Sequence, residues 1–293
     1  MIEDHVADAA GLDVRAVARG YRCRVDATSA AHGGGRATVP SLRWLTPPAA
    51  ALLLAAAGAW LGVVALAGDM GSMPGTMGLG FGSFVAVWTL MMAAMMLPSV
   101  APFAALYTRT IQERRRLRVV AFASGYLLVW AAAAFPAYGL AWVADRLVDG
   151  HPDAATALAA AIFVGCGVYQ LTPFKDRCLA HCRSPLGFLV KYGASRGRGR
   201  DFVVGSRHGA FCLGCCWALM ALLGVFGIMN LVAMLALAAI VLVEKTWARG
   251  TQFARAIGVV ALVLAVVVLF VPAVAPGLQP LAHSHPMGGM GGM

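Results

Sequence analysis

Charged residues are scarce in this chain of 293 residues. Only 12% of its residues are Asp, Glu, Lys or Arg, whereas 60% are hydrophobic and the mean hydropathy is +0.76. An average soluble domain carries roughly 25% charged residues. The apolar residues stand in blocks of about twenty, the length that a helix needs to cross the hydrocarbon core of a bilayer. The composition therefore excludes an ordinary soluble domain and predicts an all-α, polytopic transmembrane helix bundle.

Several motifs of enzymes are also missing. The chain has no Gly-rich phosphate loop that ends in Lys-Ser/Thr and no H-E-x-x-H zinc motif. These absences count against phosphoryl transfer and zinc-dependent hydrolysis, and we predict no catalytic residue. The first fifteen residues are polar and acidic and contain no apolar core of a signal peptide, so we expect no cleaved leader.

Seven apolar segments predict seven membrane spans. They run at about 49–68, 81–106, 119–144, 154–172, 208–226, 229–244 and 256–275. All Lys and Arg residues except Arg146 fall in alternate connecting segments. The positive-inside rule therefore predicts a plasma-membrane protein with its N-terminus in the cytoplasm and its C-terminus outside. The net charge of +10 reflects this orientation, so we expect the lipid bilayer, and no nucleic acid, as a partner.

Methionine and histidine gather in two segments on the predicted outer side. We expect a flexible cytoplasmic tail over 1–46, a helical membrane domain over 47–276 and an outer His/Met-rich tail over 277–293. In the Gly-rich loop 69–80 and in the outer tail, methionine has no core to fill, although a frayed terminus is an equally simple account of the tail. The weaker predicted metal ligands here are Met70, Met73, Met77, His283, His285, Met287, Met290 and Met293.

Cysteines gather at the predicted cytoplasmic face in two motifs, CLAHC after the fourth span and CLGCC in the first turns of the fifth. In each motif the thiols are three or four residues apart and share one helical face. Cytosolic thiols stay reduced, so such groups favour metal binding or redox exchange over structural disulfides. We predict metal ligation by Cys178, His181, Cys182, Cys212, Cys215 and Cys216. Weaker candidates are Cys166, His208 and Glu244.

Four methionines stand within the six residues MMAAMM of the second predicted span. Thioethers are soft ligands that select Cu(I), but methionine is also a flexible filler of cores. We predict a ligand role for Met91, Met92, Met95 and Met96, with packing as the open alternative. From outside to inside, thioethers are then followed by thiolates, which describes an inward route for Cu(I) or a relay to a partner protein.

Several longer motifs resemble one bacterial family. They are MMAAMMLPSVAPF, GY-x-x-VW, YQLTPFKDRCLAHCRSPLGFL, HGAFCLGCCWALM and GIMNLVAMLALAAIVLVEK. The chain resembles, over about 80–245, a domain-of-unknown-function family described as predicted metal-binding integral membrane proteins. The resemblance implies a helical membrane protein that binds a metal, with no reaction attached. The methionines of MMAAMM and the Cys and His residues of CLAHC and CLGCC fall on matching positions, whereas the outer Met and His segments lie outside the match.

Together these patterns predict an integral membrane protein that binds a soft metal ion, Cu(I) above others. The protein would transport the ion or exchange it with a copper-accepting or copper-donating partner protein. Two alternatives remain open. One is a membrane thiol-disulfide oxidoreductase that uses CLAHC and CLGCC as exchanging pairs. The other is a non-catalytic assembly subunit in which methionine and cysteine only pack.

Overall fold

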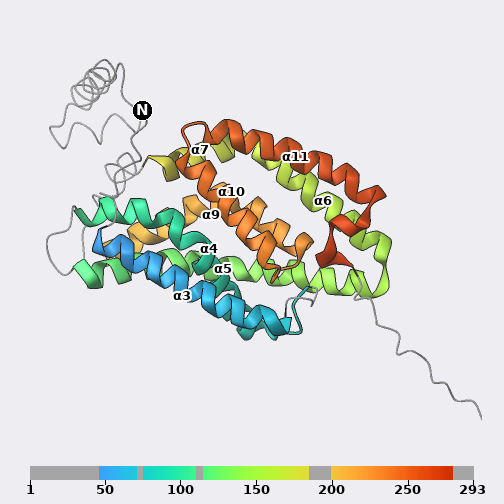
Figure 1. Ribbon diagram of the computed structural model, residues 1–293, viewed down its shortest axis with the longest axis horizontal. Coiled ribbons are helices and arrows are strands. Elements are labelled where there is room, and N and C mark those ends of the chain that lie inside the picture. Colours follow the sequence, from blue (N-terminus) through green and yellow to red (C-terminus); the bar gives the residue numbers. More distant parts are fainter. Residues whose placement is uncertain (1–45, 71–74, 110–114, 185–198, 280–293) are drawn as a thin grey trace, which may run out of the picture. The chain divides into compact units, whose positions relative to one another are not determined.

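The computed structural model describes residues 46–70, 75–109, 115–184 and 199–279 (Figure 1). Regular structure within these residues is helical, which confirms the prediction of an all-α chain. The helices are α3 (Pro47–Met70), α4 (Phe81–Arg109), α5 (Arg115–Gly150), α6 (Pro152–Gln170), α7 (Pro173–Arg183), α9 (Arg200–Phe226), α10 (Leu231–Thr246), α11 (Gly250–Phe270) and the short 3-10 helices η2 (Pro272–Val274) and η3 (Pro276–Leu278).

Six of these helices, α3, α4, α5, α6, α9 and α11, are long and apolar enough to cross a membrane. They correspond to six of the seven predicted spans and are compatible with a multi-pass membrane protein. The remaining predicted span, 229–244, coincides with α10, which has 16 residues. At a rise of 1.5 Å per residue α10 is about 24 Å long, which is shorter than the hydrocarbon core of about 30 Å.

The fifth predicted span begins earlier than its hydropathy indicates. Helix α9 starts at Arg200, and its polar first turns are helical because they have partners on other helices. Asp201 forms an ion pair with Arg118 of α5, with Nε and Oδ2 2.8 Å apart, and also accepts a hydrogen bond from Tyr107 of α4. As a result, CLGCC lies near the middle of α9 rather than in its first turns.

Helices α5 and α9 approach each other closely through glycine. A Cβ atom on Gly205 of α9 would stand 2.0 Å from the carbonyl oxygen of Phe122, and one on Gly125 of α5 would stand 2.2 Å from that of Phe202. Small residues allow such backbone contact between membrane helices, where dispersion forces replace the hydrophobic effect as the source of attraction. This contact fixes the thiol-bearing part of α9 against α5.

The short helix α7 follows α6 directly and packs against α9. Pro173 occupies its first turn, and the Thr172 side chain accepts a hydrogen bond from the backbone N–H of Lys175 at 3.3 Å. A threonine cap followed by proline is a strong start signal for a helix. After this turn, CLAHC lies alongside α9. Helix α6 also lies side by side with α11 (Figure 1).

Candidate metal site

The two cysteine motifs meet where α7 packs on α9. The Sγ atom of Cys182 in α7 lies 3.8 Å from the Sγ atom of Cys215 in α9. The Cys212 thiol interacts with the side chains of Cys182, Cys215 and Cys216. We call these four cysteines the thiol cluster. All of them are free thiols. The structure therefore brings residues of CLAHC and CLGCC together, and their predicted role as metal ligands remains a prediction.

The side chains of the thiol cluster do not point to a common centre. Among the described residues, no three His, Cys, Asp or Glu side chains surround a common point as metal ligands. The thiols of Cys215 and Cys216 instead contact the carbonyl oxygen of Cys212, at 3.1 and 2.8 Å. Metal–thiolate bonds of about 2.3 Å allow one ion to join two sulfur atoms up to about 4.6 Å apart. The 3.8 Å between Cys182 and Cys215 lies within that reach.

Cys178 lies beside the thiol cluster, one turn before Cys182 on α7. A Cβ atom on Gly214 of α9 would stand 3.0 Å from the Cys178 Sγ atom, so this thiol lies against a residue without a side chain. Burial raises the pKa of the Cys178 thiol. Hydrogen bonds with Cys212 and Cys215, together with burial, raise the pKa of Cys182. Both α7 thiols are therefore protonated at neutral pH until a metal ion displaces the proton.

Three polar residues that the sequence did not single out as site residues complete the surroundings of Cys212. The Nζ atom of Lys245 in α10 lies 2.9 Å from the Cys212 Sγ atom and 3.0 Å from the Ser99 Oγ atom of α4. The hydroxyl of Tyr126 in α5 lies 3.0 Å from the same Sγ atom. In the sequence, only the position of Lys245, an ionisable residue at the end of an apolar helix, indicates a functional role for it. The contacts themselves depend on how four helices are rotated against each other.

The methionines of MMAAMM lie in the core of the helix bundle. Met91, Met92, Met95 and Met96 are each 2% exposed or less, as the packing alternative expects. Their C-terminal end lies close to the thiol cluster, because Ser99 donates a hydrogen bond to the carbonyl oxygen of Met96 at 2.8 Å and accepts one from Lys245, which contacts Cys212. Burial in the core and a ligand role are compatible here.

The two predicted histidines are held by aromatic stacking. His181 stacks on Phe211 with ring centroids 4.3 Å apart, and its Nδ1 atom lies 2.8 Å from the carbonyl oxygen of Arg177. His208 is buried and stacks on Phe103 with ring centroids 4.1 Å apart. Both rings belong to the helices that carry the thiol cluster, His181 to α7 and His208 to α9. Their predicted ligand role remains a prediction.

Glu244 and Cys166 have surroundings of their own. Glu244 accepts hydrogen bonds from Lys175 at 2.7 Å and from Gln170 at 3.0 Å, and the Lys175 and Glu244 side chains are each 1% exposed. The arrangement is a buried ion pair that joins α6, α7 and α10, and Glu244 therefore does not pair with its neighbour Lys245. Cys166 is a buried free thiol in α6.

The outer loop differs from its prediction at Met77, which we expected to be exposed. Met77 is 3% exposed and adopts a left-handed backbone conformation with φ 56°. The loop folds back because the backbone N–H and the hydroxyl of Thr76 both donate to Asp145 Oδ2 of α5, at 3.0 and 2.7 Å. The Met70 side chain lies outside the described residues, as do Met73, His283, His285, Met287, Met290 and Met293.

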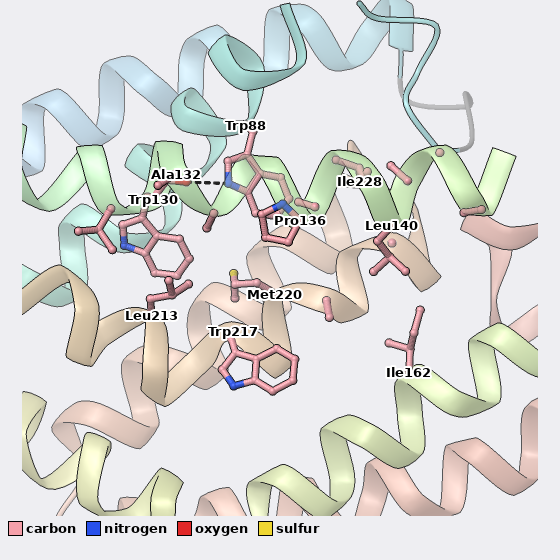
Figure 2. A pocket seen from close by; sticks show the side chains of 18 of the residues that line it. Trp88, Trp130, Ala132, Pro136, Leu140, Ile162, Leu213, Trp217, Met220 and Ile228 are labelled. Carbon is pink, nitrogen blue, oxygen red and sulfur yellow. Dashed lines mark hydrogen bonds between the residues drawn. The ribbon is translucent and has the colours of Figure 1, made fainter. Parts of the chain in front are cut away.

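An apolar cavity of about 720 Å³ lies between α5, α6 and α9. Figure 2 shows Trp130 and Pro136 of α5, Ile162 of α6 and Trp217 of α9 around it. Gly214 lines the cavity and is also the residue against which the Cys178 thiol lies. The cavity therefore extends to the segment of α9 that carries CLGCC.

A family model described as "PpoB2: Copper chaperone" matches residues 85–268. The matched range covers more than half of the chain and includes MMAAMM, both cysteine motifs and Lys245. No curated protein and no solved structure matches the chain.

Proposed function

The chain belongs to the PpoB2 copper chaperone family, and from this premise we propose that its thiol cluster binds Cu(I) and delivers the ion to a copper-accepting protein at the membrane. Copper handling follows from the family. The choice of the thiol cluster as the binding site, of Cu(I) as the oxidation state and of delivery as the task is our proposal. We also propose the orientation with the N-terminus in the cytoplasm and the plasma membrane as the location.

The observation that carries this proposal is the approach of Cys182 to Cys215 across two helices. Soft thiolates select Cu(I) over harder divalent ions, and a pair of thiols on separate helices can release an ion when one helix shifts. Cys212, Cys215 and Cys216 are at most 1% exposed, whereas Cys182 is half-buried. An acceptor would therefore reach the bound ion from the side of Cys182.

The methionines of α4 supply a route toward this site. Consecutive hydrogen bonds join the backbone carbonyl of Met96 to Ser99, Ser99 to Lys245 and Lys245 to Cys212, so this end of MMAAMM lies near the thiol cluster. Under the proposed orientation, Cu(I) would move from the thioethers of α4 to the thiolates of α9. This order follows rising affinity for a soft cation.

A second candidate function is thiol-disulfide exchange. The same two sulfur atoms, of Cys182 and Cys215, are 3.8 Å apart and would need to approach to about 2.05 Å to form a disulfide. Formation of that bond would remove two thiolates from the site. A redox enzyme therefore predicts a titratable disulfide and little bound copper, which is the reverse of what a chaperone predicts.

Liposomes that contain the purified protein distinguish delivery of copper from transport of copper. Delivery predicts that Cu(I) added outside under reducing conditions stays bound to the protein until an acceptor is supplied. Transport predicts that copper enters the vesicle when no acceptor is supplied, and a Cu(I) indicator enclosed in the vesicle would detect it. Cys182→Ser should abolish copper retention, and Cys166→Ser, a buried thiol of α6, is the matched control that should retain it. A protein that binds no copper would overturn the proposal.

A further inference from the structure

Lys245 contacts the thiol cluster although an acidic residue precedes it in the sequence. Its Nζ atom lies 2.9 Å from Cys212 Sγ and 3.0 Å from Ser99 Oγ. The neighbouring carboxylate of Glu244 is held by Lys175 and Gln170. In the described part of the chain, Lys245 forms no ion pair with a carboxylate. The sulfur of Cys212 is therefore the group that faces its positive charge.

A positive charge in this position has an electrostatic consequence for the ion that the cluster can hold. Removal of a charge from water is costly unless an opposite charge is close. Two thiolates around one monovalent cation carry a net charge of −1, which a single ammonium group balances. Two thiolates around one divalent cation are already neutral, so the same ammonium group would leave a net charge of +1.

We propose that Lys245 is a positioning residue that balances the charge of a single monovalent soft cation bound by Cys212 and a second thiolate of the cluster. The inference rests on the proposed function and deepens it, because it assigns the substrate as one Cu(I) or Ag(I) ion. It also gives Lys245 a role that differs from anchoring α10. The bound complex is stabilised by the ammonium group, whereas the copper-free protein holds that group without a carboxylate partner.

Substitution of Lys245 tests the proposal by affinity. Competition with a chromophoric Cu(I) chelator under reducing conditions measures the affinity of wild type, Lys245→Met, Lys245→Gln and Lys245→Arg. Hydrogen bonds to charged groups contribute about 1.5–3 kcal/mol, so removal of the charge should weaken Cu(I) binding about tenfold to hundredfold. Lys245→Arg keeps the charge and should restore most of the affinity. Arg255→Gln removes an exposed positive charge that pairs with Asp176 and should leave the affinity at the wild-type value.

Thermal unfolding with and without Cu(I) gives the second measurement. Cu(I) should raise the unfolding temperature of wild type and Lys245→Arg more than that of Lys245→Met, because the ammonium group balances the charge of the bound complex. A merely structural lysine predicts the same rise with Cu(I) in wild type and Lys245→Met, which would overturn the proposal. Equal affinity of wild type and the Met or Gln variant would also overturn it, and so would an Arg variant as weak as Met. In contrast, a wild-type protein that binds no Cu(I) would overturn the proposed function itself.

Discussion

The Sγ atoms of Cys182 and Cys215 lie 3.8 Å apart although 33 residues separate them in the sequence. Two contacts between neighbouring elements hold them there. Lys175 of α7 pairs with Glu244 of α10, and the hydroxyl of Tyr169 at the end of α6 donates to the carbonyl oxygen of Gly214 in α9. The position of α7, and with it the composition of the candidate site, therefore depends on buried polar contacts between helices.

Gly214→Ala should weaken Cu(I) binding. Its methyl group would stand 3.0 Å from the Cys178 Sγ atom, closer than an ordinary van der Waals contact, and a small displacement of α7 that relieves this contact would change the distance between Cys182 and Cys215. The matched control is Gly224→Ala on the same helix, where an added Cβ meets no atom within 4 Å. Chelator competition should show a severalfold loss for Gly214→Ala alone. Equal affinities of the two variants would contradict this prediction.

Gly205→Ala should destabilise the packing of α5 on α9. The added Cβ would stand 2.0 Å from the carbonyl oxygen of Phe122, and overpacking of this kind costs about 1–3 kcal/mol. Gly139→Ala in α5 is the control, because its added Cβ meets no atom within 4 Å. Thermal unfolding of the copper-free protein in detergent should occur at a lower temperature for Gly205→Ala only. An unchanged unfolding temperature would show that α5 and α9 are further apart.

Glu244→Ala should destabilise the fold strongly. It leaves the ammonium group of Lys175, whose side chain is 1% exposed, without its partner, and the loss of one member of a buried pair costs about 3–5 kcal/mol. The double variant Lys175→Met/Glu244→Leu replaces both charges with apolar groups and should recover most of the lost stability. Denaturant unfolding measures both. A double variant no more stable than Glu244→Ala would argue against this account of the pair.

Cu(I) affinity should rise with pH. Burial raises the pKa of Cys178, and hydrogen bonds with neighbouring thiols raise that of Cys182, so both release a proton when a metal ion binds. The stability of the copper-free protein should depend on pH in the opposite direction and fall as pH rises. These thiols stabilise the fold below the ordinary thiol pKa of about 8.5, and the contribution is lost as pH rises through their higher folded-state pKa. Chelator competition from about pH 6 to about pH 8, with wild type and the control Cys166→Ser, tests the first statement, and a Cu(I) affinity that stays constant over this range would contradict it.

The sequence predicts the helices of this protein better than their contacts. The length of apolar blocks locates α3, α4, α5, α6, α9 and α11, because a span is a local property of the chain. The ion pair of Lys175 with Glu244 joins residues 69 positions apart, and no periodicity in a uniformly apolar helix shows which face meets a neighbour. For the same reason the burial of Met77 and the start of α9 at Arg200 differ from prediction.

The candidate site follows the same division. Spacing of three and four residues places the thiols of each motif on one face, and loop charge predicts one side of the membrane for both motifs. The sequence therefore predicts the thiols of the site. Tyr126, Ser99 and Lys245 come from three other helices, and their roles depend on helix rotations that only the folded structure defines.

The most direct test of the account is the copper content of the purified protein after Cu(I) loading under reducing conditions and a wash with a Cu(I) chelator. The account predicts about one copper ion per chain, held by soft thiolates, in wild type and in Cys166→Ser. It predicts none in the variant with serine at all four positions of the thiol cluster, Cys182, Cys212, Cys215 and Cys216. Wild-type copper content in that fourfold variant, or none in wild type, would contradict it.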